Sequence, residues 1–306
     1  NHHLFQPLLY QVATATLSPG EIAVPIREIL RNHSNTTVLM GEVCAIDKKL
    51  KHLILKNGDH LSYDFLVLAP GTRHSYFGKE EWEKVAPGLK TIQDALNIRE
   101  QILISFEKAE RLENLEEAQK HLNFAIIGAG PTGVEMAGAI AEIAYKTLAK
   151  NFRRIHPEKA SIYLIEAAPQ ILPSYPQTLA KRAQQDLESM GVQVMLGKKV
   201  TALSSEGVEV EGRFIPCTNI IWAAGNQASS LLKTLDIPLD KQGRALVLQD
   251  LSLPGHPEIF VIGDAACFMG KEGKPLPGIA PTAIQQGKYV AKILASQAPK
   301  EKRKPF

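Results

Sequence analysis

The chain has 306 residues, of which 44% are hydrophobic and 22% charged, and a formal net charge of +3. That length is enough for two domains, and the composition is that of an ordinary globular protein, which argues against a disordered chain. The charge is spread along the sequence except for the run KEKRK at 300–304, which we interpret as a solvated tail rather than a surface for anionic lipid. The absence of a basic stripe interleaved with aromatic residues argues against nucleic-acid binding.

The cysteines and the first histidines indicate neither a disulfide framework nor a metal site. Cys44, Cys217 and Cys267 are far apart in the sequence, without a C-x-x-C pair or histidines at metal-ligand spacing. Each stands in or beside an apolar run, so we expect a small buried side chain at all three positions. His2 and His3 are adjacent, and adjacent side chains on an extended segment point in opposite directions, so they carry little weight as metal ligands.

In chain order, the first 71 residues predict the end of one α/β unit. A helix is expected near 24–31 and a strand at 37–40. Short alternating strands joined by glycine turns follow from residue 41, and a buried strand then closes on Ala-Pro-Gly71. A helical stretch rich in Glu, Lys and Leu follows at 92–120.

Residues 124–225 predict a second unit, which is complete. Strands and helices alternate as in a doubly wound parallel βαβαβ unit. The segment 197–225 then repeats the pattern of 41–71, with short strands, glycine turns and a buried strand that closes on Ala-Ala-Gly225. The elements expected before this repeat are strands at 124–127, 161–165 and 193–196, and helices at about 132–149 and 177–190.

Comparison of the two blocks predicts that the first domain is discontinuous. The first block has no counterpart of the first strand, glycine turn, first helix and second strand of the second block. A later segment, with a strand that ends at Asp264 and a helix near 281–294, has no counterpart in the second block and is expected to return to the first domain. The predicted fold is therefore α/β, with two doubly wound Rossmann-like dinucleotide-binding domains, the first incomplete. The expected segments are 1–95 and 241–306 for the first domain, and 96–240, with the crossover helix, for the second.

A G-x-G-x-x-G motif follows the strand at 124–127, with its glycines at Gly128, Gly130 and Gly133. In this motif the first glycine allows a tight turn, the second lets backbone amides approach a pyrophosphate, and the third lets the helix pack closely on the strand. The motif opens a helix of small residues, with Pro131 and Thr132 between its last two glycines. It therefore predicts a dinucleotide site at the N-terminus of this helix.

Glu166 ends the next predicted strand, where a carboxylate can accept both hydroxyls of an adenosine ribose. Because its negative charge would repel a 2′-phosphate, NADH is predicted in preference to NADPH. Arg153 and Arg154 precede the strand, and we interpret them as capping the C-terminus of the helix before it. The predicted chemistry is hydride transfer from a nicotinamide.

Glu135 lies two positions after the last glycine of the motif, and we place it in the first turn of the helix. A carboxylate in a first turn can simply complement the helix dipole. The alternative is a functional carboxylate at the cofactor-binding end of the helix, where the nicotinamide ring meets its electron acceptor. Both interpretations stay open at this point.

A hydride carries two electrons, and because the chain has no dithiol, a flavin is the natural acceptor. Asp264 follows a buried strand and Gly263, where it can bond the ribityl chain and the atoms on the phosphate side of a flavin. Gly71 offers a close backbone approach at another strand end. The run GIAP at 278–281 opens a predicted helix whose positive end can stabilise a reduced flavin.

Taken together, these residues resemble the type II NADH:quinone oxidoreductases, the single-subunit respiratory NADH dehydrogenases that pump no protons. The resemblance covers essentially the whole chain. It rests on the runs NHHLFQPLLYQVA at 1–13, HSYFG at 74–78, APGLKTI at 86–92, GPTGVE at 130–135, AIAE at 139–142, WAAG at 222–225 and DLSLPG at 250–255.

The resemblance implies NADH and FAD as cofactors and assigns residues to each. It makes Glu135 the acid beside the nicotinamide–flavin contact, and Gln285 matches the glutamine near the quinone side of the flavin. Members often have A-Q-x-A-x-Q at that place, whereas this chain has APTAIQ at 280–285 and lacks the first glutamine. The NADH residues that it implies are Gly128, Gly130, Pro131, Thr132, Gly133, Glu166, Ala224 and Gly225, and the FAD residues are Gly71, Gly263, Asp264 and Ala280.

The resemblance further implies a membrane quinone as acceptor and a peripheral enzyme on the cytoplasmic face of a bacterial inner membrane. Family members have a glycine-rich FAD turn ahead of the first run and membrane-docking helices at the end; this sequence has neither, so membrane contact is expected through parts outside it. No run of about 20 apolar residues predicts a membrane span. A homodimer, a reductase of a protein carrier such as ferredoxin, and a fragment that only binds NADH stay open as alternatives. The apolar run FQPLL at 5–9 favours a lipid-soluble acceptor over a charged carrier.

Overall fold

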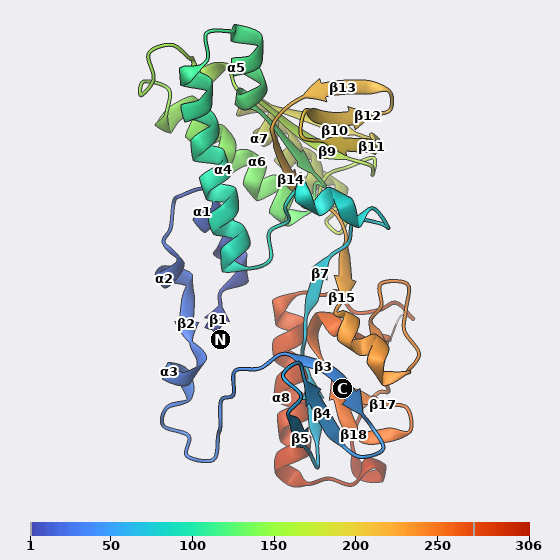
Figure 1. Cartoon of the computed structure of the whole chain (residues 1–306). Helices are drawn as coiled ribbons and strands as arrows, with labels where there is room; N and C mark the ends of the chain where they lie inside the picture. The colour runs from blue at the N-terminus through green and yellow to red at the C-terminus, as the bar shows by residue number, and fades with distance from the viewer. Residues whose placement is uncertain (1, 272) are drawn as a thin grey trace. The chain divides into compact units, whose positions relative to one another are not determined.

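The computed structural model describes residues 2–271 and 273–306 (Figure 1). The described residues form two compact units. Unit 1 comprises 2–36 and His74–Gly225, and unit 2 comprises Thr37–Arg73 and Asn226–Phe306. Both units are therefore discontinuous in sequence, and the chain passes between them after residues 36, 73 and 225. The expected domain borders at 95 and 240 stay a prediction.

A four-stranded parallel sheet lies at the centre of unit 1, in the order β10-β9-β8-β14. Its strands are β8 (Asn123–Ile127), β9 (Ser161–Glu166), β10 (Val192–Leu196) and β14 (Asn219–Trp222). Every residue of β8 and β14 is buried, as expected for a parallel sheet that is covered on both faces.

The helices of unit 1 follow the predicted alternation. α6 (Pro131–Glu142), extended by a π-helical turn (Ile143–Thr147), follows β8, and α7 (Gln177–Ser189) follows β9. The predicted crossover stretch forms α4 (Ile92–Arg111) and α5 (Leu115–Leu122). α4 begins with a capping box, in which the side chains of Thr91 and Asp94 each accept a hydrogen bond from the other residue's backbone N–H.

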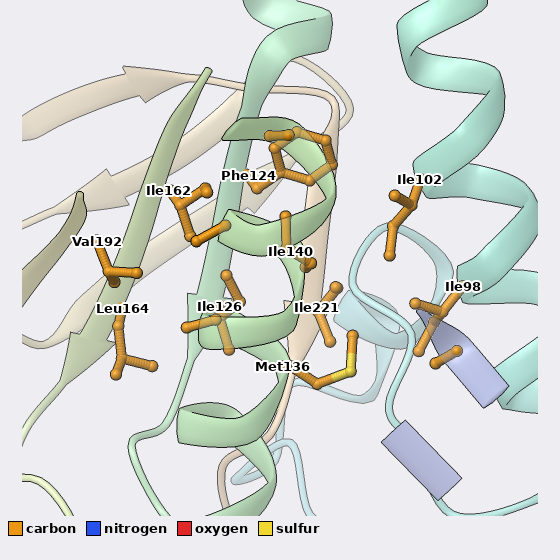
Figure 2. Packing of buried hydrophobic residues seen from close by; sticks show 14 of the residues in the cluster. Ile98, Ile102, Phe124, Ile126, Met136, Ile140, Ile162, Leu164, Val192 and Ile221 are labelled. Atoms are coloured by element: carbon orange, nitrogen blue, oxygen red, sulfur yellow. The ribbon is translucent and has the colours of Figure 1, made fainter. Parts of the chain in front are cut away.

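Alternate side chains of the parallel sheet supply two cores, because successive residues of a strand point to opposite faces. One face packs against α4, α6 and α1 (Leu9–Ala13), and its residues include Phe124, Ile126, Ile162, Leu164 and Ile221 (Figure 2). The other face packs against a three-stranded antiparallel sheet, and its residues include Ala125, Ile127, Ile165, Ile220 and Trp222. Unit 1 therefore has a helix layer, a parallel sheet and an antiparallel sheet.

The predicted repeat is confirmed. The antiparallel sheet of unit 1 is formed by β11 (Val200–Ser204), β12 (Gly207–Val210) and β13 (Arg213–Pro216), and that of unit 2 by β3 (Val43–Asp47), β4 (His52–Leu55) and β5 (His60–Ser62). Both first strands carry an irregularity at the same place, between Val200 and Ala202 in β11 and between Val43 and Ala45 in β3. Each sheet is followed by a strand that pairs in parallel, β14 with β8 and β6 (Leu66–Leu68) with β18 (His256–Val261).

Unit 2 places β6 at one edge of a three-stranded sheet, in the order β17-β18-β6. α8 (Ala280–Ser296) packs on this sheet, because Val290 and Ile293 share a core with Phe260 of β18. The remaining short strands are β7 (Thr72–His74), β15 (Asn226–Ala228), β16 (Ala245–Leu246), β17 (Ser252–Leu253) and β19 (Ala266–Cys267). Among the residues described, no helix combines the length and the apolar character needed to cross a membrane.

The N-terminal segment differs from the prediction. The helix expected near 24–31 is reduced to α3 (Ile26–Leu30), because Val24 precedes a proline and stays extended in β2 (Ala23–Pro25). β2 pairs with β1 (His2–Leu4), and α2 (Pro19–Ile22) precedes it. The strand predicted at 37–40 is absent, and Met40 is 80% exposed. This run is apolar but does not pair with any described strand, and pairing is what satisfies the backbone groups of a strand.

Two further expectations were wrong. Cys44 is exposed, because it lies at the irregularity of β3 between Val43 and Ala45 and has no partner in the ladder, whereas Cys217 and Cys267 are buried as expected. The run at 300–304 is not a solvated tail throughout, because the side chain of Arg303 is 5% exposed and pairs with Asp250 at 2.9 Å. Phe306 packs its ring against Phe268 and Tyr289. The C-terminal segment is therefore part of unit 2.

Candidate functional site

The three motif glycines meet three different local constraints. Gly128 has φ +99°, and a Cβ on it would lie 2.7 Å from the backbone nitrogen of Ala224. A Cβ on Gly133 would lie 1.9 Å from the carbonyl oxygen of Gly128, so α6 packs directly on the end of β8. A Cβ on Gly130 would meet nothing within 4 Å. The first glycine thus adopts the left-handed conformation of a tight turn, the third allows close packing, and the second leaves an open approach, as the motif predicts.

The N-terminus of α6 suits an anion. Gly130 is its N-cap and offers no side-chain cap, and Pro131 is its first residue. The first amides of a helix have no partner within it. Together with the positive end of the helix dipole, they attract a phosphate group.

Glu166 ties the end of β9 to the glycine turn. Its carboxylate accepts the backbone N–H of Ala129 at 2.7 Å and that of Ala168 at 2.8 Å. Sequence reasoning missed this second role, although an acid at a strand end beside a glycine turn is its signal. Each carboxylate oxygen has a further lone pair and can still accept a hydroxyl. The predicted capping of the helix by Arg153 and Arg154 is not seen, because the guanidinium of Arg153 donates to the carbonyl oxygen of Lys150, beyond the helical turn that ends at Thr147, and Arg154 donates its backbone N–H to Glu110.

Glu135 is the fifth residue of α6, which places it in the second turn. Its predicted place in the first turn is wrong, because the helix begins at Pro131. The interpretation that Glu135 complements the helix dipole is therefore also wrong, since that effect is confined to the first turn. Glu135 is exposed, and within the described residues its carboxylate has no hydrogen bond or ion pair. Desolvation by surrounding atoms nevertheless raises the pKa of this carboxyl.

The glycine turn lies where the strand order of the sheet changes direction. From β8 the chain adds β9 and β10 on one side, whereas β14 pairs on the other side. Ligands of open α/β sheets bind beyond the carboxyl ends of the strands at such a point. At that edge Ala223 donates its N–H to the carbonyl oxygen of Ile127 at 2.8 Å, and Gly225 follows with φ +70°. Ala224 and Gly225 therefore lie beside the glycine turn, and their contact with NADH stays a prediction.

The residues predicted for a flavin gather at strand ends in unit 2. Gly71 has φ +65° with open space around it, and Gly263 has φ +68°. The hydroxyl of Thr72 lies 3.5 Å from the carboxylate of Asp264. Ala280 begins α8, whose N-cap carries no side-chain cap. The expected flavin residues are thus brought together within one unit.

Gln285 and its neighbour Gln286 have different surroundings. Gln285 is exposed, and its amide donates to the carbonyl oxygen of Pro281 one turn earlier in α8. Gln286 is 1% exposed and accepts the N–H of Gly263 at 2.7 Å. Sequence reasoning missed Gln286, although its spacing from Val290 and Ile293 on the buried face of α8 could have revealed it.

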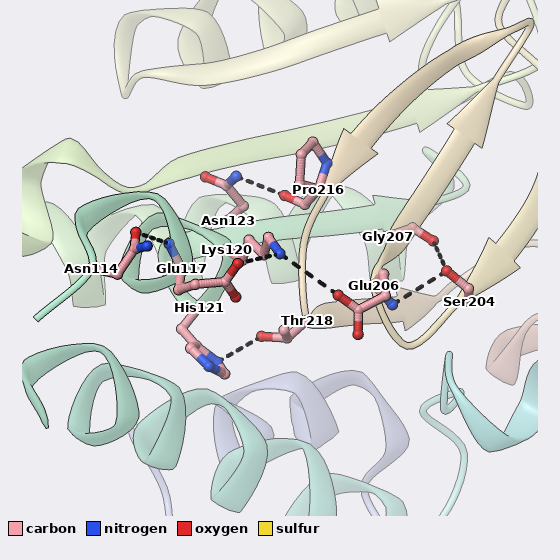
Figure 3. A network of polar contacts seen from close by, with 10 residues as sticks. All are labelled: Asn114, Glu117, Lys120, His121, Asn123, Ser204, Glu206, Gly207, Pro216 and Thr218. Carbon is pink, nitrogen blue, oxygen red and sulfur yellow. Dashed lines mark hydrogen bonds and ion pairs between the residues drawn. The ribbon is translucent and has the colours of Figure 1, made fainter. Parts of the chain in front are cut away.

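A cavity of about 320 Å³ lies elsewhere in unit 1, between α4 and the start of β14. His121, Thr218 and Asn219 line it, and Thr218 bonds the His121 ring at 3.0 Å (Figure 3). Asn219 begins β14, so this cavity is at the amino end of that strand. It is therefore distinct from the glycine turn, which lies at the carboxyl ends.

Comparison with known proteins identifies the family. The family model of the pyridine nucleotide-disulphide oxidoreductases matches residues 1–287. The type II NADH:quinone oxidoreductase Ndh of Mycobacterium tuberculosis is 44% identical, over 100% of this chain and 68% of its own length. The chain belongs to the type II NADH:quinone oxidoreductase family. A family member from Staphylococcus haemolyticus is 30% identical over 96% of this chain and 72% of its own.

The solved structures agree with this family and with the predicted fold. NDH2 from Plasmodium falciparum, in complex with NADH, has a TM-score of 0.80 and 26% identity, over 89% of this chain and 59% of its own. The chain thus spans roughly 60 to 70% of the length of its relatives in this family. The expected α/β fold with Rossmann-like dinucleotide-binding domains is confirmed.

Proposed function

We propose that this chain oxidises NADH by hydride transfer to FAD and passes the electrons to a membrane quinone, as the names of its relatives indicate. The observation that carries the proposal is the glycine turn of unit 1. The turn has no room for a side chain at Gly128, which lies against the backbone of Ala224, or at Gly133, where α6 packs on it, and it is open at Gly130, where a pyrophosphate must approach. The turn leads into the N-terminus of α6, which has no side-chain cap.

NADH would bind along the carboxyl edge of the parallel sheet. The pyrophosphate would meet the backbone of Gly130, Pro131 and Thr132 at the start of α6. The adenosine ribose would meet Glu166, whose carboxylate already closes the glycine turn. A 2′-phosphate would face this negative charge, so NADH is preferred to NADPH.

The nicotinamide would lie toward Ala224 and Gly225, on the β14 side of the turn. As the hydride leaves, the nicotinamide gains positive charge, and a nearby carboxylate stabilises that change. Glu135 is the unpaired carboxylate on α6, and we assign it this role. Its raised pKa is consistent with the partly desolvated place that such a role requires.

The residues of unit 2 fit FAD. Asp264 follows a strand end and has open acceptor capacity, Gly71 leaves room at a second strand end, and the first amides of α8 at Ala280 are uncapped. FAD, when bound, supplies the acceptor for the two electrons of the hydride. Gln286 holds the backbone of Gly263 in place, and we assign exposed Gln285 to the quinone side.

We further propose a peripheral location on the cytoplasmic face of a bacterial inner membrane. Phe5, which is 54% exposed beside other apolar residues of the N-terminal run, favours a lipid-soluble acceptor over a charged protein carrier.

The test compares Gly130→Val with wild type. We expect wild type to bind NADH, to form a yellow complex with FAD and to reduce a soluble quinone. The variant should unfold at the wild-type temperature, because open space surrounds its new side chain, but should lose NADH affinity. A wild-type protein that binds no NADH contradicts the proposal, and equal affinity for NADPH contradicts the role of Glu166.

A further inference from the structure

We propose that Phe77 forms an aromatic wall of the nicotinamide subsite and stacks on the nicotinamide ring of NADH. The inference rests on the proposed function and adds a binding residue to it. Phe77 is 71% exposed, whereas Tyr76 beside it and Trp222 beneath it are 1% and 2% exposed. The ring of Phe77 is therefore exposed to solvent, although the two aromatic rings beside it are buried.

The backbone of Phe77 shows that this exposure is imposed by its surroundings. Its φ is +54°, in the left-handed region that a bulky residue rarely adopts. Such a conformation persists only where neighbouring contacts hold it. The indole N–H of Trp222 donates to the carbonyl oxygen of Ser75 at 3.0 Å, and Ser75 donates its own N–H to the carbonyl oxygen of Gly225. Tyr76 stacks on Trp222, with ring centroids 5.0 Å apart.

These contacts hold the Phe77 ring over the end of β14. A Cβ on Gly225 would lie 2.7 Å from Cζ of Phe77, so the ring covers Gly225, and a side chain at that position would displace it. Gly225 directly follows Ala224, whose backbone is in close contact with Gly128. The ring therefore borders the glycine turn on its β14 side, within unit 1.

The strand order indicates which part of NADH reaches this place. Glu166 ends β9, the glycine turn follows β8, and Gly225 follows β14, and these strands are neighbours in the order β9-β8-β14. If the ribose lies at Glu166 and the pyrophosphate at the turn, the rest of the dinucleotide continues toward β14. The group that arrives at Phe77 is then the nicotinamide, a flat ring that an exposed phenyl group can stack on.

The decisive experiment measures the affinity of the protein for NADH and for ADP-ribose, which lacks the nicotinamide. We expect Phe77→Ala to weaken NADH binding by up to about tenfold, the range of an aromatic pair, and to leave ADP-ribose binding unchanged. Phe77→Leu retains apolar packing over Gly225 and should also weaken the binding of NADH but not that of ADP-ribose. Phe77→Tyr keeps an aromatic ring and should bind NADH as tightly as wild type.

Phe214 provides a matched control in the same unit. It is 52% exposed on β13, and its ring also covers a glycine, since a Cβ on Gly207 would lie 2.8 Å from its Cζ. Phe214→Ala should change neither affinity. If the Phe77 variants bind NADH as tightly as wild type, or lose ADP-ribose equally, the inference is wrong. If wild type binds neither ligand, the proposed function itself fails.

Discussion

The two units contain the same strand pattern in different surroundings. In unit 1 the strand after the antiparallel sheet, β14, is buried throughout beside β8, and the glycine that ends it, Gly225, lies under Phe77. In unit 2 the corresponding strand, β6, is also at the edge of its sheet, but its Val67 is 38% exposed, and open space surrounds its terminal glycine, Gly71. The two glycines nevertheless have nearly the same φ, +70° and +65°. Local sequence thus determines the turn, whereas residues distant in the sequence, here Phe77 and Ser75, determine what the turn faces.

A second difference is how each unit secures its helix layer. Unit 1 packs α6 through a glycine that touches the carbonyl oxygen of Gly128. Unit 2 secures its last helix, α8, with the segment that follows it, in which Arg303 pairs with Asp250 and Phe306 packs on Tyr289 of that helix. Close backbone packing thus holds α6 in unit 1, whereas a buried ion pair helps to hold α8 in unit 2. Substitutions can test this contrast.

The largest effect is expected from Arg303→Ala in unit 2. Asp250 would keep a side chain that is only 11% exposed and would lose its cation, and removing one partner of a buried pair costs about 3–5 kcal/mol. Lys302→Ala is the control, since that exposed neighbour should change stability by less than about 0.5 kcal/mol. Urea unfolding measures both. Equal stability of the two variants would mean that the C-terminal segment does not secure unit 2.

A smaller effect on stability is expected from Gly133→Ala in unit 1. The added methyl would lie 1.9 Å from the carbonyl oxygen of Gly128, and such overpacking costs about 1–3 kcal/mol. Gly130→Ala is the matched control, because nothing lies within 4 Å of its new methyl. Thermal unfolding should separate the two. If they unfold together, the third glycine of the motif is not needed for helix packing.

Glu135→Gln is expected to slow NADH oxidation without affecting the fold. A unit charge that acts over about 10 Å at an effective dielectric constant of about 20 contributes about 1.7 kcal/mol, or about twentyfold in rate. Glu142→Gln on the same helix is the control, since that carboxylate pairs with Lys146 at 3.2 Å. Steady-state kinetics with a soluble quinone would show wild-type rates for both variants if Glu135 has no part in the reaction.

Sequence patterns predicted the features that depend on local spacing. The alternation of strands and helices, the repeat and the three glycines of the motif follow from periodicity and turn chemistry. The prediction for the C-terminal run failed because it depends on a contact between residues that are distant in the sequence. No local pattern distinguishes Arg303 from the lysines around it, because its partner Asp250 is 53 residues away. The position of Glu135 failed for another reason, because a shift of one or two residues at a helix start changes which residues belong to the first turn.

The smallest effect concerns pH, and the two units should respond in opposite directions. Burial favours the neutral form of Asp250, but hydrogen bonds from Ser252 and Arg303 outweigh it and hold the pKa of Asp250 below its ordinary 3.8. Its contribution to the stability of unit 2 is therefore present above pH 3.8 and is lost as pH falls through the lowered pKa. Desolvation raises the pKa of Glu135 above 4.5, so its contribution to unit 1 is present below pH 4.5 and is lost as pH rises through the raised pKa.

Unfolding between pH 3 and pH 7 tests this contrast. Asp250→Asn should reduce the loss of stability that unit 2 shows as the pH falls below 3.8. Glu135→Gln should remove the loss of stability that unit 1 shows as the pH rises above 4.5. The glutamine cannot ionise, so any slope near this pH that persists in Glu135→Gln belongs to another group. An unchanged profile in that variant would mean that the carboxyl of Glu135 is solvated like an ordinary surface glutamate, and its assignment to the nicotinamide site would lose its electrostatic support.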